Sequence, residues 1–382
     1  MQVLLKRRYT AHMHKLGDIF LQDKMDKRTQ DNLFRELALH EGKIDFSSND
    51  YLGFSRLESL RTHTISSASG ATGSRLISGH TAEAEAAEKK IADFHGTDAA
   101  LIFNCGYMAN IGLFSCLAEK GDTWIADAYI HASILDGMRL SYAQRYKFGH
   151  NDMEDLEKKL KLATGRKFVA VESIYSMDGD EAPLKTIVDL CKQYNAFLIV
   201  DEAHATGIYG QNGEGLVTKY GLQKDVLACV YTFGKALGLH GAAITGSENL
   251  RHYLINYARP FIYSTALPPY AYRQIQQAYH ELPGIDRVVL FDLIHHFRHC
   301  IQKMDSVSFL DSQSQIQGIL IGDNKKTKDL SDYLYGKGIY AKAILSPTVP
   351  KGKERLRICL HTFNTEEDIE LLMEEIKTFL WI

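Results

Sequence analysis

The sequence of 382 residues lacks the features that mark secreted, membrane-spanning or nucleic-acid-binding proteins. Its six cysteines are scattered and form no CxxC pair, which is typical of reduced core thiols in a cytoplasmic protein. No apolar run reaches transmembrane length, and the N-terminal MQVLLKRRYT contains no signal-peptide hydrophobic segment. A formal net charge of −3 gives no electrostatic reason to expect nucleic acid or an anionic membrane as a partner. We therefore expect cytoplasmic localisation.

Two motifs that suggest other chemistry lack the residues that chemistry needs. DEAH, at residues 201–204, occurs in certain nucleic-acid-stimulated ATPases, but those also require a GxxxxGK[ST] loop, which is absent here. His295 and His299 have the i, i+4 spacing of metal ligands on a helix, yet no third ligand or acidic neighbour accompanies them. We predict no nucleotide-binding loop and no metal site.

The order of apolar and polar segments predicts an α/β protein with two domains. Short apolar strands alternate with helical segments through most of the chain, and the texture changes near residue 285. We expect an N-terminal arm over residues 1–45, a large domain with a mainly parallel sheet over 46–284, and a small α+β domain over 285–382.

The segment YTFGKALGLHGAAITGS, residues 231–247, contains the most unusual lysine of the chain. Lys235 lies in a glycine-containing turn between two strands that appear buried. Desolvating an ammonium group costs several kcal/mol unless something compensates. The amine could instead form a Schiff base with a carbonyl cofactor. The alternative is a loop lysine whose charged end reaches water.

An acidic residue and a histidine precede this lysine at the end of another apolar strand. FLIVDEAHATG, residues 197–207, places Asp201 and His204 at the carboxyl end of a predicted strand, where functional groups of parallel α/β sheets gather. A buried aspartate needs a cationic partner, and the protonated ring nitrogen of pyridoxal phosphate (PLP) is one.

The order strand–Asp201–x–x–His204, then strand–Thr232–x–x–Lys235, resembles the fold-type I PLP enzymes (aspartate aminotransferase-like), and specifically the α-oxoamine synthase family. The motifs NDYLG, SMDGD, IYST, PTVP and RLR extend the resemblance over roughly residues 33–375. The resemblance implies that Lys235 binds the cofactor aldehyde, Asp201 its ring nitrogen and His204 its phenolic oxygen, with Thr232 close by.

The resemblance also assigns cofactor contacts elsewhere in the chain. Gly106 and Tyr107 lie in the turn between a predicted strand that ends at Asn104 and a predicted helix over residues 108–119, a position that favours anions because unpaired N–H groups of the helix point at it. Family likeness places the cofactor phosphate there, stacks His131 on the ring and sets Ser176 beside it. Thr265 would reach the phosphate of the other subunit, which implies a homodimer with shared active sites.

The substrate residues implied by the family are less uniformly matched. Asn49 and Arg357 would contact the amino-acid carboxylate, and Thr348 would approach the substrate. Arg35 stands where relatives often keep an arginine at the acyl entrance. Asn49 could equally cap its turn, and Arg35 could be a solvated helix residue. Leu345 occupies a position where relatives often have arginine.

Two loops receive weaker assignments. The GSRLISG loop is family-like, and we expect Ser74 and His80 to face the cofactor site, with Thr81 capping the following helix. Asp178 and Asp180 are a possible carboxylate pair, but the SMDGD composition is that of a turn, so we assign both to structure.

The reaction implied by the resemblance is a decarboxylating condensation of L-alanine with a pimeloyl thioester, carried by CoA or a carrier protein, as in biotin biosynthesis. Relatives that use glycine with acetyl-CoA or serine with palmitoyl-CoA share the same cofactor residues. A non-catalytic partner subunit is a third reading, and the presence of Lys235, Asp201, His204 and His131 argues against it.

Overall fold

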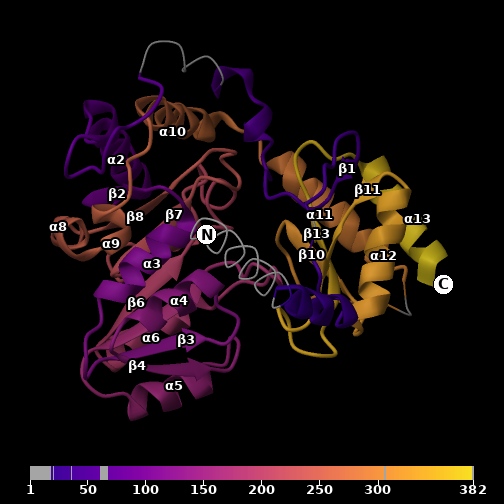
Figure 1. The fold of residues 1–382 in the computed structure, drawn as a ribbon, viewed down its shortest axis with the longest axis horizontal. Helices are drawn as coiled ribbons and strands as arrows, with labels where there is room; N and C mark the ends of the chain where they lie inside the picture. Colours follow the sequence, from indigo (N-terminus) through magenta and orange to yellow (C-terminus); the bar gives the residue numbers. More distant parts are fainter. Residues whose placement is uncertain (1–18, 20, 36, 61–67, 305–306, 381–382) are drawn as a thin grey trace, which may run out of the picture.

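The computed structural model describes residues 19, 21–35, 37–60, 68–304 and 307–380. The chain forms two lobes, one built on a seven-stranded sheet and the other on a four-stranded sheet (Figure 1). This confirms the predicted fold class, a large α/β domain with a small C-terminal α+β domain. The predicted boundaries at residues 46 and 285 remain predictions.

The large sheet is parallel except for one strand. Its spatial order is β2 (Ala99–Phe103), β8 (Ala242–Gly246), β7 (Ala228–Thr232), β6 (Ala196–Asp201), β5 (Lys167–Glu172), β3 (Thr123–Asp127) and β4 (Gln144–Phe148). β8 runs antiparallel to both of its neighbours, because it returns from β7 through the short turn that carries Lys235.

The central strands are buried on both faces, as their continuous apolar runs predict. Along β3, Trp124 and Ala126 face one hydrophobic cluster and Ile125 faces the other. One face is covered by α3 (Gly106–Cys116), α4 (Ala132–Leu140), α8 (Glu248–Tyr257) and α9 (Arg259–Ile262). The other face is covered by α2 (Ala82–His95), α5 (Met153–Leu162), α6 (Leu184–Gln193), α7 (Leu216–Lys219) and α10 (Pro269–Glu281).

Helix α2 begins and ends at sequence signals. The side chain of Thr81 accepts a hydrogen bond from Ala84 N, which confirms the predicted N-cap, and Gly96 ends the helix in the left-handed conformation. Three short 3₁₀ segments connect other elements: η1 (Phe54–Arg56), η2 (Glu58–Leu60) and η4 (Leu282–Gly284).

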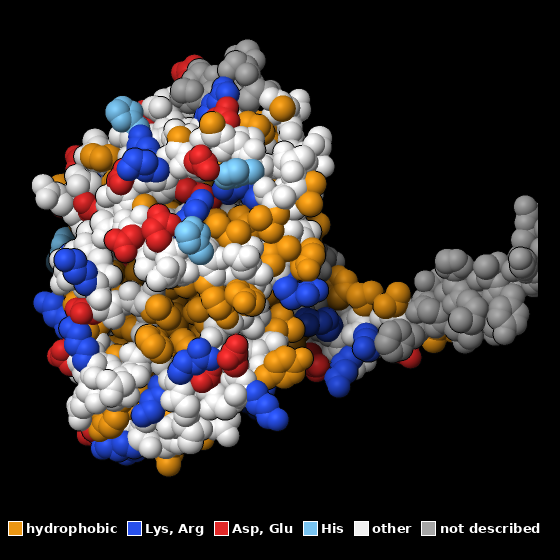
Figure 2. Space-filling model, turned by 90° about the vertical axis from the view of Figure 1, so that its left-hand side faces the viewer, with side chains coloured by type: hydrophobic (Ala, Val, Ile, Leu, Met, Phe, Trp, Pro, Cys, Tyr) orange, Lys and Arg blue, Asp and Glu red, His pale blue; other side chains and the backbone are white. Residues whose placement is uncertain are grey.

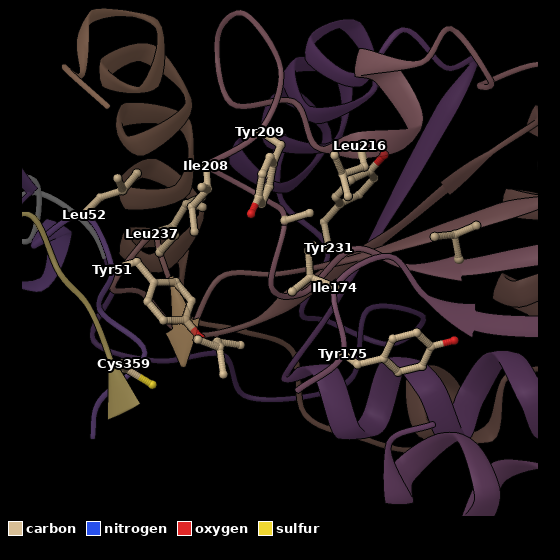
Figure 3. Packing of buried hydrophobic residues seen from close by; sticks show 14 of the residues in the cluster. Tyr51, Leu52, Ile174, Tyr175, Ile208, Tyr209, Leu216, Tyr231, Leu237 and Cys359 are labelled. Atoms are coloured by element: carbon tan, nitrogen blue, oxygen red, sulfur yellow. The ribbon is translucent and has the colours of Figure 1, made fainter. Parts of the chain in front are cut away.

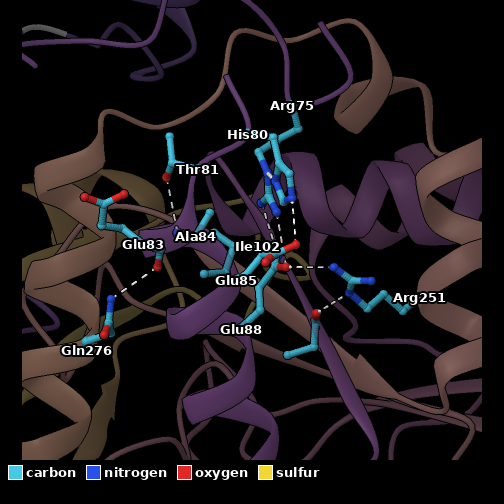
Figure 4. A network of polar contacts seen from close by, with 11 residues as sticks. Arg75, His80, Thr81, Glu83, Ala84, Glu85, Glu88, Ile102, Arg251 and Gln276 are labelled. Atoms are coloured by element: carbon cyan, nitrogen blue, oxygen red, sulfur yellow. Dashed lines mark hydrogen bonds and ion pairs between the residues drawn. The ribbon is translucent and has the colours of Figure 1, made fainter. Parts of the chain in front are cut away.

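A buried ion-pair network ties α2 to the sheet (Figure 4). Glu88 accepts hydrogen bonds from Arg75 at 2.7 and 3.1 Å and from Arg251 at 3.2 Å, and its carboxylate also receives Ile102 N. His80, expected at the cofactor site, instead accepts from Arg75 Nε. The GSRLISG loop is therefore held by its arginine against the large domain.

The four-stranded sheet of the small lobe is antiparallel. The sheet has the order β12 (Lys342–Ile344), β13 (Arg355–Cys359), β10 (Ile316–Leu320) and β9 (Ser308–Phe309), packed with α11 (Val288–Ile301), α12 (Asn324–Gly336) and α13 (Glu366–Leu380). The end of the predicted N-terminal arm and the residue that follows it join this lobe: β1 (Ile44–Asp45) pairs with β11 (Ile339–Tyr340), and Phe46 O accepts from Cys359 N.

The turn at residues 176–180 connects the two lobes. Arg355 of β13 binds Asp178, and Ser312 Oγ donates to Gly179 O at 2.9 Å. A Cβ on Gly179 would lie 2.1 Å from Ile316 O, so only glycine fits where the small lobe approaches. The turn is therefore the main docking point for β10 and β13.

A histidine clamp holds the same turn to β3. His150 lies between Asp127 Oδ1 at 2.9 Å and Asp180 Oδ2 at 2.7 Å, with Tyr129 stacked on its ring. Burial alone would lower the pKa of His150, but the two carboxylates raise it to about 10. These contacts agree with the structural assignment of Asp178 and Asp180.

Candidate active site

Most of the predicted cofactor residues meet in one cavity of about 240 Å³, although Ser176, His204 and Thr265 do not line it. It lies where β5, β6 and β7 end and α3 begins, which is the edge at which parallel strands collect functional groups. Lys235, Asp201, Thr232, Gly106 and His131 line it. A larger groove of about 740 Å³ near Arg287 lies elsewhere, and there Arg287 is held by backbone carbonyls, Gly207 O among them.

The lysine turn is rigidly closed. Leu239 N and Gly241 O both bond to the backbone of Phe233, at 2.8 and 3.0 Å. Gly238 has φ +58, and a Cβ there would lie 2.2 Å from Ser55 N, so the turn is pressed against the segment at residues 54–55. The turn therefore fixes where Lys235 enters the cavity.

The pKa of the Lys235 amine lies close to neutral pH. Burial lowers its pKa to about 8, although Asp201 and Glu172 oppose this effect. Lys235 Nζ lies 2.8 Å from Nε2 of His204. Burial first, and then the charge of Lys235, hold the pKa of His204 well below its usual range, so this histidine is neutral. Lowering the pKa of an amine raises the share of its neutral form, which is the form that attacks a carbonyl carbon.

Asp201 provides a buried carboxylate held by uncharged donors. Ala203 N donates to Oδ1 at 3.0 Å, and Asn110 Nδ2 donates to Oδ2 at 2.9 Å. Within the described part of the chain no salt bridge neutralises this carboxylate directly. A cationic ring N–H placed in the cavity would satisfy that need, so the site fits the pyridine end of PLP.

The beginning of α3 provides the opposite, anion-binding end. Its N-cap residue Cys105 makes no side-chain cap, so the first N–H groups of the helix are available. The hydroxyl oxygen of Thr232 is buried without a hydrogen-bond partner among the described residues. A Cβ on Gly106 would lie 2.5 Å from Thr232 Cγ2. This close approach and the unpaired hydroxyl fit the phosphate of PLP.

His131 and Glu172 complete the wall between these ends. Ser133 N donates to His131 Nδ1 at 3.2 Å, which leaves the proton of the neutral ring on Nε2. Burial lowers the pKa of His131, while the charge of Asp201 raises it. Burial, and then the charge of Asp201, raise the pKa of Glu172. Oε1 of Glu172 is buried without a hydrogen-bond partner among the described residues.

The predicted carboxylate-binding pair lies beside the cavity. Asn49 lines it, and Arg357 Nη2 donates to Asn49 Oδ1 at 3.2 Å. Arg357 Nε donates to Ser176 O at 2.8 Å and Nη1 contacts Cys359 Sγ at 2.9 Å. These contacts hold the guanidinium group in place beside the cavity.

Of four further predicted residues, Tyr107 lines the cavity and the other three do not. Tyr107 is partly exposed on α3, and its hydroxyl donates to Asp136. Thr265 and Thr348 are exposed and do not line the cavity of their own chain. Arg35 is exposed within the N-terminal segment. The roles proposed for these four residues stay predictions.

The structure also adds residues that the motifs did not identify. Asn110 and Ser133 line the cavity and hydrogen bond to each other. Tyr51 does not line the cavity, but its hydroxyl lies 2.7 Å from His204 Nδ1. Glu172 was recognisable as the last residue of a buried strand, like Asp201. Asn110 is one turn along α3 from Gly106, a helical spacing that could have indicated it.

Metal and membrane alternatives find no support in the described residues. No group of three or more His, Cys, Asp or Glu side chains among them is arranged to hold a metal ion. In the same part of the chain, no helix combines the length and the apolar character needed to cross a membrane.

Fold and site together define a fold-type I PLP enzyme, and the chain belongs to the family of aminotransferases of class I and II, whose family model matches residues 41–376. It is similar to 8-amino-7-oxononanoate synthase of Lysinibacillus sphaericus, with 38% identity over 340 residues and 87% of each chain covered. The structure of 8-amino-7-oxononanoate synthase from Francisella tularensis superposes with a TM-score of 0.79 at 30% identity, covering 89% of this chain and 98% of that one.

A second kind of relative is structurally as similar. Serine palmitoyltransferase of S. paucimobilis, determined with bound PLP and myriocin, superposes with a TM-score of 0.86 at 27% identity, covering 94% of this chain and 96% of that one. The resemblance found in the sequence is therefore confirmed at the level of family, fold and cofactor class.

Proposed function

We propose that the protein condenses L-alanine with a pimeloyl thioester, forming 8-amino-7-oxononanoate, CO2 and free thiol, a reaction of biotin biosynthesis. The observation that supports it most directly is the position of Lys235, whose amine shares one cavity with Asp201 and an uncapped helix N-terminus. Full-length similarity to 8-amino-7-oxononanoate synthases supports the choice of substrates.

Bound PLP would supply an aldehyde that joins to amines and a pyridinium ring that withdraws electrons from the amino-acid Cα. The protein's own groups hold the cofactor and move protons. Asp201 would keep a proton on the ring nitrogen, and Gly106 N and Thr232 Oγ1 would hold the phosphate. Lys235 Nζ, with a pKa lowered by burial, takes the proton from Cα and later returns it.

Asn49 and Arg357 would orient the amino-acid carboxylate. The buried position of Arg357 favours a desolvated ion pair, in which a bidentate guanidinium contact fixes the direction of the carboxylate. Alanine presents only a methyl group beside Cα, whereas a serine-using site must also satisfy a hydroxyl. Sites that hydrogen bond a substrate hydroxyl discriminate far more strongly than sites that only accommodate a methyl group.

Release of free thiol tests this proposal against the serine palmitoyltransferase alternative. We expect L-alanine with pimeloyl-CoA or a pimeloyl carrier protein to give faster release than glycine with acetyl-CoA or L-serine with palmitoyl-CoA. Lys235→Ala should lose both the release and the visible absorption of bound PLP, and His80→Gln, outside the cavity, should retain both. Faster release with the acetyl or palmitoyl donor would show that the family is right and the substrate wrong.

We further propose that the protein is a cytoplasmic homodimer whose sites use residues of both chains. Thr265 is exposed and does not line its own cavity, while Asn104 Nδ2 donates a hydrogen bond to its carbonyl oxygen at 2.8 Å. Exposed apolar side chains occupy the neighbouring helices, including Tyr257 on α8 and Tyr263 just after α9. Figure 2 shows apolar side chains gathered on the face of the molecule that carries α8. A second copy would cover them.

Subunit exchange tests the shared sites. Lys235→Ala and Thr265→Ala proteins should each be impaired, and mixing them should restore activity in the dimers that assemble one intact site. A Thr265→Ser protein should resemble the wild type, because it keeps the hydroxyl. Confirmed exchange without any recovery would count against sites built from both chains.

A further inference from the structure

A continuous chain of hydrogen bonds connects the proposed carboxylate site to the reactive lysine. Arg357 Nη2 donates to Asn49 Oδ1 at 3.2 Å, and Tyr51 Oη lies 2.9 Å from the same oxygen. Tyr51 Oη also lies 2.7 Å from His204 Nδ1, and His204 Nε2 lies 2.8 Å from Lys235 Nζ. We call these five residues the Tyr51 relay.

The chemistry of Arg357 fixes the direction of every proton in the relay. A guanidinium can only donate, so the atom of Asn49 that faces it is the carbonyl oxygen. Tyr51 must then donate its own proton to that oxygen, and it accepts from His204 Nδ1–H. The neutral ring consequently carries no proton on Nε2, which accepts from Lys235.

Burial keeps water away from Tyr51 and His204, the two central members of the relay. Tyr51 is fully buried and His204 is almost so, and burial raises the pKa of the Tyr51 hydroxyl well above its usual range. Figure 3 shows Tyr51 at the junction of the lobes, near Cys359 of β13. A hydroxyl in such a place needs its partners, since leaving a buried polar group unpaired is costly.

We propose that, before PLP binds, Tyr51 is a positioning residue that sets the tautomer of His204 and thereby makes its Nε2 the hydrogen-bond acceptor for the free amine of Lys235. The inference deepens the proposed function, because Lys235 is the reactive amine there. Neither Tyr51 nor the direction of the relay follows from the arrangement of cofactor contacts, since Tyr51 does not line the cavity.

The Tyr51 relay has a second arrangement, in which the hydrogen bonds at Tyr51 and His204 run in the reverse direction. If Asn49 no longer offers an acceptor, the Tyr51 hydroxyl turns and donates to His204 Nδ1, and the ring proton moves to Nε2. An Nε2–H that faces Lys235 favours the neutral amine, whereas an Nε2 lone pair favours the ammonium form. Breaking the relay at Asn49 should therefore lower the pKa of Lys235.

Other groups also face Lys235 and set the background for this effect. They are Asp201 at the end of β6, Glu172 at the end of β5, His131 before α4, and Arg357 and Cys359 on β13. The test variants keep all of these groups, so a change in Lys235 reports on the relay. The substitutions at Tyr51 and Asn49 are separated from Lys235 by one or more residues.

The tautomer of His204 can be read by ¹⁵N NMR of histidine-labelled full-length protein after removal of PLP, with the signal assigned from His204→Gln. We expect a protonated Nδ1 in the wild type. Asn49→Ala should move the proton to Nε2, and Asn49→Asp, which keeps an oxygen acceptor, should leave it on Nδ1. Tyr51→Phe should also lose the Nδ1–H form.

Tyr175→Phe is the matched control, because Tyr175 is also fully buried but its ring lies against His150. It should leave the His204 tautomer unchanged. A second readout is the pH dependence of PLP uptake by Lys235, whose midpoint should fall by about one unit in Tyr51→Phe and Asn49→Ala but not in Tyr175→Phe.

An Nε2–H tautomer in the wild type, or an unchanged tautomer in Asn49→Ala, would overturn the proposal. If Tyr51→Phe does not fold, Asn49→Ala alone decides. Because the tautomer is measured without substrate, its result stands apart from the identity of the substrates. A protein that prefers another thioester but shows the expected tautomers would contradict only the proposed function.

Discussion

Substituting Gly106 by alanine should weaken cofactor binding by about 10- to 100-fold. The added Cβ would lie 2.5 Å from Thr232 Cγ2, whereas carbon atoms in contact are normally separated by about 3.5–4.0 Å. Relief requires the start of α3 and β7 to separate by about 1 Å. Overpacking of this kind costs about 1–3 kcal/mol, and each 1.4 kcal/mol corresponds to about tenfold in affinity.

Thr232→Ser offers a rescue, because it removes the obstructing methyl group and keeps the hydroxyl that we assign to the phosphate. Titration of the cofactor-free protein with PLP, followed by absorption, measures the affinity of the wild type, both single variants and the double variant. We expect Gly106→Ala/Thr232→Ser to bind PLP more tightly than Gly106→Ala alone, a coupling that a double-mutant cycle quantifies.

The control is Gly112→Ala on the same helix, where the added Cβ would lie 3.0 Å from Phe103 Cε1 and away from the cavity. This variant should change the unfolding free energy without changing PLP affinity. Wild-type affinity in Gly106→Ala, or no recovery in the double variant, would refute the assignment of α3 and Thr232 to the phosphate.

Three further predictions concern charge. Glu88→Gln should lower the free energy of unfolding, measured in urea, by about 3–5 kcal/mol, because it leaves the buried guanidinium group of Arg75 without its carboxylate. The control Lys89→Gln, in an exposed ion pair, should change the same free energy by less than about 1 kcal/mol. Equal losses in the two variants would contradict the argument from burial. Because the pKa of His150 rises from its usual value of about 6.5 to about 10 on folding, its contribution to stability is complete below pH 6.5 and is lost as the pH rises through 10. Urea unfolding across this range should show the loss, and His150→Gln should flatten the profile. PLP uptake by Lys235 should accelerate as the pH passes about 8, the pKa of its amine. Asp201→Asn should lower the midpoint of this pH profile, because the charge of Asp201 raises the pKa of Lys235. Stopped-flow absorption measures the midpoint, and a higher midpoint in Asp201→Asn would contradict the prediction.

The fold could be predicted largely because local signals and the family resemblance agree. The apolar runs at β5, β6 and β7 indicated buried parallel strands, and Thr81 and Gly96 marked the ends of α2. The crossing of residues 44–53 to the small lobe was not predictable. β1 is only two residues long, and its pairing with β11 is a contact between distant parts of the chain that leaves no periodic pattern.

The site was predictable where residues follow a strand and was missed where they approach sideways. Asp201 ends an apolar strand and Lys235 lies in the turn after another, and both patterns can be recognised in the sequence. Asn110 and Tyr51 reach the same centre from a helix and from a segment bonded to the small lobe, so only the tertiary structure brings them together. His80 shows the reverse error, because the loop that carries it is family-like but its arginine turns the ring toward α2.

The two arginines of β13 limit how the lobes can move. Arg355 and Arg357 are two residues apart on one strand, so their side chains project from the same face, and both bind the turn at residues 176–180. A slide along β13 by one residue, about 3.3 Å, would pull both side chains out of contact with that turn, whereas a small rotation about the strand keeps both anchored. Opening and closing of the cavity should therefore be a hinge motion with β13 as its axis, and a shearing motion between the lobes is disfavoured.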